Sequence, residues 1–304
     1  MLVTAYAPIV WGSSYYVTRE LLPADSPLWG SALRALPAGL ILLLVARRLP
    51  RGSWWWRALV LGTLNMGAFF VLVYVAAQLL PTSIAATVMA TSPLVMMLMA
   101  WAMVAQRPAL PAVVGGALGL LGVAAMVLTG AASLDVRGLV ASASAMLMSS
   151  VGFVLAQRWH DDDIDVVAST SWQLVAGGAT LLIAALAVEG APPRLDGPAW
   201  AGLAFLSLAA TALAYLAWFA GLRRLPAGTV GLVGLLNPVA GLTLGLLVAH
   251  EHLALQQALG ALVVLAGVAL GHPALALRSR RRHPAPAPPA PTPPDLATPR
   301  PAAP

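Results

Sequence analysis

The chain is a succession of apolar stretches separated by charged residues, prolines and glycine-rich turns. A helix that crosses a bilayer needs roughly 20 apolar residues, and most of the stretches have about that length. The pattern therefore predicts ten transmembrane helices, at roughly 2–18, 28–46, 56–78, 82–105, 109–129, 137–157, 164–188, 198–221, 226–249 and 254–276.

Composition supports this interpretation. Of the 304 residues, 60% are hydrophobic and only 9% are charged, whereas a soluble domain has about 25% charged residues. The chain is therefore expected to be an all-α membrane protein with the lipid bilayer as its surroundings, and not a cytoplasmic enzyme or a nucleic-acid binder. It contains no cysteine, which excludes disulfides and thiolate metal sites.

The distribution of arginine predicts the orientation, because loops on the cytoplasmic side carry the excess of basic residues. With a cytoplasmic N-terminus, only Arg19, Arg137 and Arg194 fall in outer loops. The inner loops and the tail then hold Arg47, Arg48, Arg51, Arg57, Arg107, Arg158, Arg223, Arg224, Arg278, Arg280, Arg281, Arg282 and Arg300. The expected location is the inner (cytoplasmic) membrane of a cell, with both termini in the cytoplasm.

The sequence also repeats itself. A shift of 145 residues places Leu80-Pro81 on Leu225-Pro226, Pro93 on Pro238 and Gly115 on Gly260. This predicts two five-helix repeats, 1–130 and 131–276, followed by a proline-rich cytoplasmic tail, 277–304, which is expected to be disordered because it cannot bury apolar surface.

A five-helix repeat contains an odd number of crossings, so the second copy must enter the membrane upside down. The arginines fit this inversion, since the loop after the second helix is rich in arginine and its counterpart after the seventh is not. Inverted repeats place a site at the interface between the halves, where it can open to either side of the membrane in turn. This arrangement indicates a secondary transporter that works by alternating access.

Several motifs resemble the drug/metabolite transporter superfamily, EamA type. The likeness is most specific in Thr211-Ala-Leu-Ala-Tyr215-x-x-Trp218-Phe219, Asn237-Pro238-Val239 and Glu251-x-Leu253, and it continues in Trp11-Gly12-Ser13-Ser14. The resemblance covers residues 1 to about 276. It implies ten helices in two EamA-like repeats and transport of small solutes or metabolites, often outward, but it does not identify the solute.

Polar and aromatic residues near the middle of equivalent predicted helices are the candidates for a solute cavity. We expect them to be substrate-binding: Trp11, Ser13, Ser14, Tyr15, Arg34, Asn65, Phe69, Thr91, Ser149, Ser150, Thr211, Tyr215 and Asn237. For any single serine or threonine, hydrogen bonding between helices is the more common role, so the prediction rests on the set and not on one member.

Arg34 lies inside a predicted span, where an unpaired charge costs roughly 2.5 to 3.5 kcal/mol on insertion scales. Such a residue usually faces a cavity, but a long side chain could instead snorkel to the nearby interface. Pro93 and Pro238 occupy equivalent mid-span positions. Because proline removes a helical hydrogen bond and bends the helix, both are expected to act in gating.

The solute is expected to be a small metabolite, amino acid-like or amphipathic, and export is the expected direction. No cofactor and no metal is expected. Glycines such as Gly115-x-x-x-Gly119 permit close helix packing and could also form a dimer face, so a homodimer stays open.

Two alternatives remain at this stage. An intramembrane enzyme acting on lipid-linked substrates would need a metal site in Asp161-Asp162-Asp163-Ile164-Asp165 or in His250-Glu251-His252. A channel is the other alternative.

Overall fold

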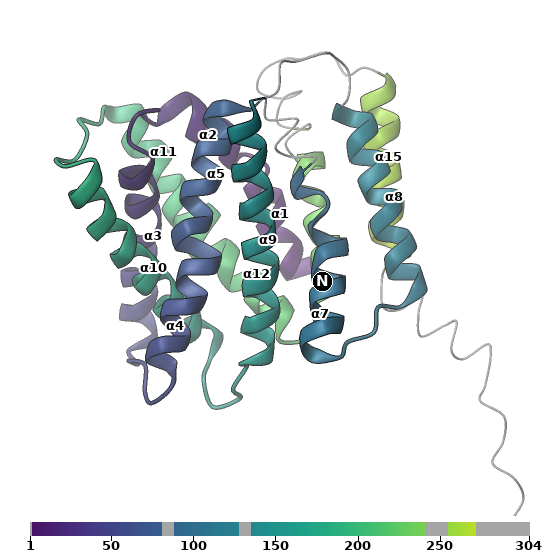
Figure 1. The fold of residues 1–304 in the computed structure, drawn as a ribbon, viewed down its shortest axis with the longest axis horizontal. Coiled ribbons are helices and arrows are strands. Elements are labelled where there is room, and N and C mark those ends of the chain that lie inside the picture. Colours follow the sequence, from purple (N-terminus) through teal and green to yellow (C-terminus); the bar gives the residue numbers. More distant parts are fainter. Residues whose placement is uncertain (1, 81–87, 128–134, 241–242, 244–254, 272–304) are drawn as a thin grey trace, which may run out of the picture.

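A computed structural model describes residues 2–80, 88–127, 135–240, 243 and 255–271, and these residues form a bundle of helices (Figure 1). The first half consists of α1 (Leu2–Trp11), α2 (Ser14–Leu21), α3 (Pro27–Ala46), α4 (Trp54–Gly62), η1 (Thr63–Gly67), α5 (Ala68–Leu79), α7 (Ser92–Val104) and α8 (Leu110–Val127). The second half consists of α9 (Val136–Arg158), α10 (Val166–Val188), α11 (Gly197–Ser207), η2 (Leu208–Leu213), α12 (Ala214–Leu222), α13 (Ala227–Gly234) and α15 (Leu255–Leu270).

Helices that continue one another group into the ten predicted spans, so the all-α membrane fold is confirmed. Five of these spans are long and apolar enough to cross a membrane by themselves: Pro27–Ala46, Trp54–Leu79, Val136–Arg158, Val166–Val188 and Gly197–Leu222. Shorter apolar helices, among them Ser92–Val104 and Ala227–Ala240, make up others.

The first span differs from the prediction, which made it one helix over 2–18. The helix breaks at Gly12 and Ser13, and a second helix continues to Leu21. The hydroxyl of Ser13 donates to the carbonyl oxygen of Val10, 2.7 Å away. The backbone N–H of Ser13 donates to the same oxygen at 3.2 Å, so this carbonyl has two donors at the break.

Among the described residues, each half contains one π-helical turn, η1 in the first and η2 in the second. The two turns begin at Thr63 and Leu208, and 63 plus 145 is 208, so they occupy the same place in the two repeats. A π-turn widens the helix and disturbs its regular hydrogen bonds, and it is frequent at functional sites. Amino-acid identity does not reveal this symmetry, since the two segments have no identical aligned residue.

The prolines do not bend continuous helices as predicted. Pro93 is the second residue of α7, which begins after a turn at Ala90 and Thr91. Proline is favoured at the start of a helix because its missing N–H has no partner there anyway. On the other side, α13 ends at Gly234, and the chain turns at Leu235 before helical residues that include Pro238. The fourth and ninth spans are thus interrupted at equivalent places.

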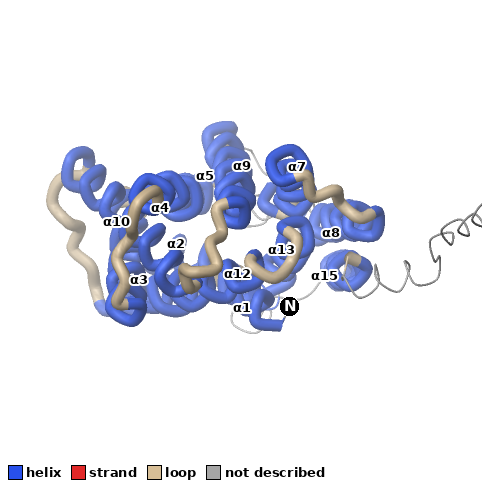
Figure 2. The backbone as a smooth tube through the Cα atoms, turned by 90° about the horizontal axis from the view of Figure 1, so that it is seen from below, coloured by secondary structure: helices blue, strands red, loops and turns tan. Residues whose placement is uncertain are grey.

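The last helices of the two halves, α8 and α15, pack against each other at one end of the bundle, away from α3 and α10 (Figure 2). A Cβ on Gly115 would meet the carbonyl oxygen of Gly267, and one on Gly122 would lie 2.7 Å from that of Gly260. The earlier glycine of α8, Gly115, therefore lies against the later glycine of α15, Gly267. The later glycine of α8, Gly122, lies against the earlier glycine of α15, Gly260. The two equivalent helices run antiparallel, as inverted repeats require.

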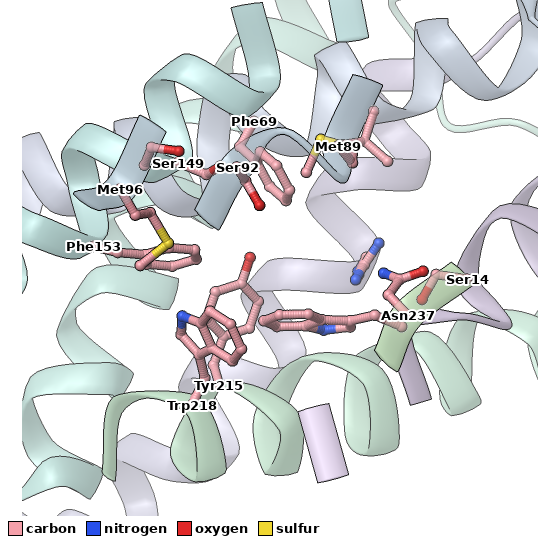
Figure 3. A pocket seen from close by; sticks show the side chains of 14 residues that line it. Ser14, Phe69, Met89, Ser92, Met96, Ser149, Phe153, Tyr215, Trp218 and Asn237 are labelled. Atoms are coloured by element: carbon pink, nitrogen blue, oxygen red, sulfur yellow. The ribbon is translucent and has the colours of Figure 1, made fainter. Parts of the chain in front are cut away.

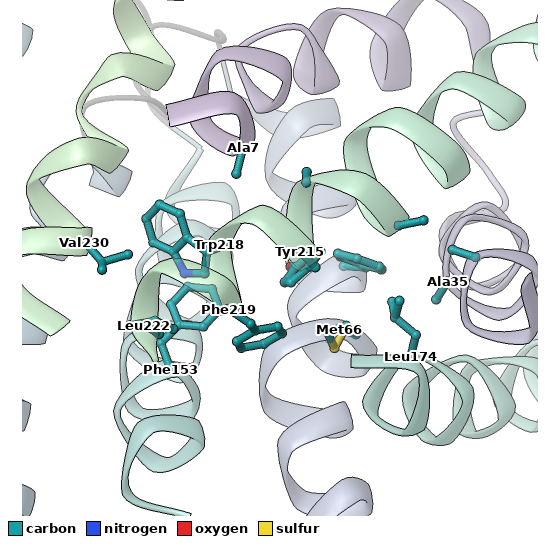
Figure 4. Packing of buried hydrophobic residues seen from close by; sticks show 14 of the residues in the cluster. Ala7, Ala35, Met66, Phe153, Leu174, Tyr215, Trp218, Phe219, Leu222 and Val230 are labelled. Atoms are coloured by element: carbon teal, nitrogen blue, oxygen red, sulfur yellow. The ribbon is translucent and has the colours of Figure 1, made fainter. Parts of the chain in front are cut away.

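The largest cluster of buried apolar residues in the described part of the chain contains residues of both halves. It gathers Met66 and Phe70 from the third span, Phe153 and Leu174 from α9 and α10, and Tyr215 from α12 (Figure 4). Aromatic side chains at the centre contact each other at ring centroid distances of 5.2–6.5 Å. These contacts fix the positions of the side chains around the candidate site.

Three aspartates begin helices in the second half. Asp135, Asp165 and Asp196 are the N-caps of α9, α10 and α11, and their carboxylates accept hydrogen bonds from backbone N–H groups. Such caps satisfy donors that the first helical turn leaves unpaired. The hydrogen bond from the Arg137 side chain lowers the pKa of the Asp135 carboxyl.

Candidate functional site

A pocket lies between the two halves, with about 650 Å³ of space that protein atoms do not fill. Side chains from both halves of the chain point into it (Figure 3). Its lining residues are Trp11, Ser14, Arg34, Phe69, Val73, Met89, Ser92, Met96, Ser149, Ser150, Phe153, Tyr215, Trp218 and Asn237.

Most of the residues that the sequence selected lie together at this pocket. Those that line it are Trp11, Ser14, Arg34, Phe69, Ser149, Ser150, Tyr215 and Asn237. Ser13, Asn65, Thr91 and Thr211 do not line it. The side chain of Tyr15 lies outside the described residues.

Arg34 is directed into the bundle and does not snorkel. Its side chain is only 7% exposed. The Nε donates to the Oγ1 of Thr211, 2.8 Å away, and the terminal nitrogen donates to the carbonyl oxygen of Ala210 at 3.4 Å. The guanidinium also lies 4.2 Å from the ring centre of Phe70, a favourable cation–π contact. The charge is thus held by several partners at the wall of the pocket.

The two π-turns provide backbone acceptors at the pocket. The hydroxyl of Tyr215 donates to the carbonyl oxygen of Asn65 at 2.8 Å, and the indole Nε1 of Trp11 donates to that of Ala210 at 2.8 Å. Asn65 and Ala210 are equivalent under the 145-residue shift. Both acceptors are therefore bound by aromatic side chains of the pocket wall, which holds these side chains in place.

Several predicted polar residues serve helix geometry. Thr91 donates to the carbonyl oxygen of Val88 at 2.7 Å, at the break before α7. Ser149 and Ser150 both donate to the carbonyl oxygen of Met146. The amide of Asn65 donates to the side chain of Gln173 at 3.1 Å. These hydroxyl and amide donors are satisfied within the protein.

Six lining residues were not selected from the sequence: Val73, Met89, Ser92, Met96, Phe153 and Trp218. Helical spacing could have found three of them. Val73 is four residues after Phe69, Phe153 is four after Ser149 and Trp218 is three after Tyr215, and residues three or four apart share a helix face. No comparable signal distinguishes Met96 from Met97.

Two polar groups at the pocket have no hydrogen-bond partner among the described residues. They are the indole Nε1 of Trp218 and the hydroxyl of Ser14, both more than nine-tenths buried. Leaving a buried donor unpaired costs roughly 1 to 3 kcal/mol.

Two glutamines form hydrogen bonds beyond the pocket, one on α9 and one after the end of α7. Phe153 lines the pocket, and one turn further along α9 the amide nitrogen of Gln157 donates to the carbonyl oxygens of Leu222 and Leu225, both at 2.9 Å. The amide nitrogen of Gln106 donates to the side-chain oxygen of Gln157 at 3.1 Å. These bonds connect the end of the fourth span with the ends of the sixth and eighth.

The residues considered for a metal site are arranged differently from a metal centre. Asp165 caps α10, and the carboxylate of Asp161 accepts from the backbone N–H of Asp163 within the same loop. No group of three or more metal-ligating side chains occurs in the described part of the chain. The stretch His250-Glu251-His252 lies outside it, so that candidate stays untested.

A bundle of apolar helices with a pocket between its two halves is an arrangement found in secondary transporters. The EamA-like transporter family matches residues 1–128 and again residues 136–271. The chain therefore belongs to the EamA-like transporter family, as the sequence motifs predicted.

Known relatives agree with this membership. Over 91% of its length the chain is 35% identical to Protein PecM of Dickeya dadantii (strain 3937), of which 93% is covered. It is 24% identical to the uncharacterized transporter YvbV of Bacillus subtilis (strain 168), with 88% and 90% of the two chains covered. A solved crystal structure superimposes with a TM-score of 0.74 at 20% identity, covering 91% of this chain and 98% of the other. That likeness shows the fold alone.

Proposed function

We propose that the protein is a secondary transporter that exports a small amino acid-like or amphipathic metabolite by alternating access. The observation that carries this proposal is the pocket between the halves. The first, third and fourth spans (α1 and α2, α5, α7) line it from the first half, the sixth, eighth and ninth (α9, α12 and the helical residues around Asn237) line it from the second, and α3 adds Arg34. Equivalent helices surround it, which is the arrangement that alternating exposure needs.

The chemistry of the pocket supports the solute class. A cation, Arg34, lies at a wall that also carries Ser14 and Asn237, while Phe69, Phe153 and the two tryptophans supply apolar and aromatic surface. An anionic or zwitterionic head group would pair with the guanidinium. The apolar part of the same molecule would contact the aromatic rings.

The positions of the arginines support an orientation with both termini in the cytoplasm. In this orientation Gln106 and Gln157 close the pocket on the cytoplasmic side. Breaking their bonds would open the pocket inward, and the broken fourth and ninth spans, with Pro93 and Pro238, would allow the halves to move.

Counterflow in proteoliposomes tests the proposal. Vesicles preloaded with an unlabelled mixture of amino acids and amphipathic monocarboxylates are expected to accumulate a labelled member of that mixture transiently, which is a property of carriers. Uptake that never exceeds equilibrium, for every member, would indicate a channel. The same panel in a thermal-shift assay is expected to raise Tm, because a ligand that binds only the folded state stabilises it.

A further inference from the structure

A second cavity lies at the end of α3, outside the transport pocket. It has about 950 Å³ of unfilled space, and its walls are Arg47, Arg48, Leu49, Pro50, Arg51, Trp54, Trp55, Ile164 and Trp172. None of these residues lines the transport pocket. Three arginines and three tryptophans line this one cavity. The arginines make it positively charged, so a negatively charged ligand would be attracted to it.

The loop that forms this cavity is held in a defined shape. Arg47 ends α3 in the left-handed conformation, with φ 51°, and its backbone N–H donates to the carbonyl oxygen of Leu43 at 2.8 Å. The carbonyl oxygen of the next residue, Arg48, accepts from the indole Nε1 of Trp172 on α10 at 2.7 Å. The arginines are thus presented by a fixed turn.

The positive charge of the cavity is only partly compensated. Arg48 donates to the carbonyl oxygen of Asp163 at 3.1 Å and lies 3.9 Å from the carboxylate of Asp165. Within the described part of the chain, no side-chain hydrogen bond or ion pair involves Arg47 or Arg51. The buried indole Nε1 of Trp54 also has no partner there. Two cations remain for a ligand.

Below the arginines, the last two turns of α3 and the start of the loop expose large apolar side chains. Leu44, Val45 and Leu49 have 75%, 66% and 64% of their surface exposed. Trp55, at the rim, is 62% exposed. Tryptophan is enriched where the membrane meets water, so the cavity lies at head-group level, with an apolar track beneath it.

We propose that this cavity binds the phosphate of an anionic phospholipid, with the guanidinium groups of Arg47 and Arg51 on the phosphate and an acyl chain along Leu44 and Val45. Basic pockets between membrane helices bind such head groups. A soluble phosphate offers the same charge, but it would leave the apolar track uncovered. The combination of both features favours the lipid.

Native mass spectrometry of the full-length protein in detergent, titrated with phosphatidylglycerol or phosphatidylcholine, tests this site. The double variant Arg47→Asn, Arg51→Gln removes both cations, and asparagine is chosen because it accepts a positive φ. Each basic residue near a membrane surface contributes about 1 kcal/mol toward anionic lipid, so binding of the first phosphatidylglycerol is expected to weaken about 30-fold. Phosphatidylcholine is expected to bind weakly to both proteins.

The matched control is Arg158→Gln, Arg224→Gln, which removes the same charge at the same end of the helices from residues that do not line the cavity. It is expected to bind phosphatidylglycerol as the wild type does. Equal weakening in the control, or equal binding in the cavity variant, would overturn the proposal.

Glycerol phosphate distinguishes the source of the phosphate. As a competitor at millimolar concentration it is expected not to displace phosphatidylglycerol, and efficient displacement would assign the cavity to a soluble phosphate instead. The Tm of the lipid-free double variant is measured as well and is expected to equal that of the wild type. This measurement distinguishes a variant that has lost the lipid site from one that no longer folds. A variant that unfolds is replaced by the single changes, each expected to weaken binding about 5-fold.

Discussion

Arg34 on α3 donates a hydrogen bond from its Nε to the Oγ1 of Thr211 in η2, 2.8 Å away. The bond joins the second span of one half to the π-turn of the other, directly beside the pocket. A buried cation is therefore oriented by the opposite half. A solute that binds this cation would also affect the contact between the halves.

Replacement of Arg34 tests whether the guanidinium binds solute. Hydrogen bonds to a charged group contribute about 1.5 to 3 kcal/mol, so Arg34→Ala is expected to lower the affinity for an anionic or zwitterionic solute by roughly 10 to 100-fold. Thr211→Val removes the positioning bond and keeps the charge, and its effect is expected to be several times smaller. Binding and uptake of the same solute are measured for both. Equal losses would make Arg34 a structural residue.

The unpaired indole of Trp218 gives a second prediction. Trp218→Phe keeps an aromatic ring against Trp11 and Phe153 but removes the N–H donor. A hydrogen bond contributes about 0.5 to 1.5 kcal/mol, so solute affinity is expected to fall roughly 2 to 10-fold. Trp200→Phe, at an exposed position, is expected to leave affinity unchanged. Isothermal titration of the purified variants measures the difference, and an unaltered affinity in Trp218→Phe would remove the donor from the site.

The antiparallel crossing of α8 and α15 should be sensitive to a single methyl group. In Gly267→Ala the new Cβ would lie 2.5 Å from the carbonyl oxygen of Gly115, and neither backbone can move away easily. Overpacking of this kind costs about 1 to 3 kcal/mol, so a lower Tm is expected. Gly197→Ala, where a Cβ meets nothing within 4 Å, is the control. The Tm of both variants is measured by thermal unfolding in detergent. Equal Tm values for Gly267→Ala and Gly197→Ala would contradict the close contact between α8 and α15.

The glutamine pair predicts a shift in conformation. Gln157→Leu leaves the carbonyl oxygens of Leu222 and Leu225 without their side-chain donor, and this weakens closure at that end. Because the sequence has no cysteine, a single thiol introduced by Met96→Cys reports on the pocket. Its reaction with a reagent added from the Gln157 side is expected to become faster in the Gln157→Leu background. Unchanged or slower reaction would mean that the glutamines do not close the pocket.

The spans, their number and the repeat could be predicted because length, hydropathy and the 145-residue shift all appear in the sequence. The breaks in the first, fourth and ninth spans could not be predicted from the sequence. Gly12 and Pro93 are compatible with either a bent or an interrupted helix, and the choice depends on what Ser13 and Thr91 can bond to in three dimensions. The π-turns at Thr63 and Leu208 have no sequence signature, since a helix that gains one residue per turn keeps the same apolar composition.

The candidate site was predictable where polarity singles out a residue within an apolar span, as for Arg34, Ser14 and Asn237. The sequence could not show which polar residues form hydrogen bonds within the protein and do not line the pocket. Thr211 accepts a hydrogen bond from Arg34, and Asn65 donates one to Gln173. Apolar lining residues such as Met96 lack any local signal. They are selected by the packing of helices that are distant in the sequence.

The central claim is that one pocket between inverted halves opens to each side of the membrane in turn, and thiol accessibility tests it most directly. The thiol introduced by Ser92→Cys lines the pocket, while Arg19→Cys and Arg224→Cys place exposed reporters at opposite ends of the bundle. With an impermeant reagent, Arg19→Cys is expected to react only from outside intact cells and Arg224→Cys only in inside-out vesicles. Ser92→Cys is expected to react from both sides, and reaction from one side only under all conditions would contradict alternating access.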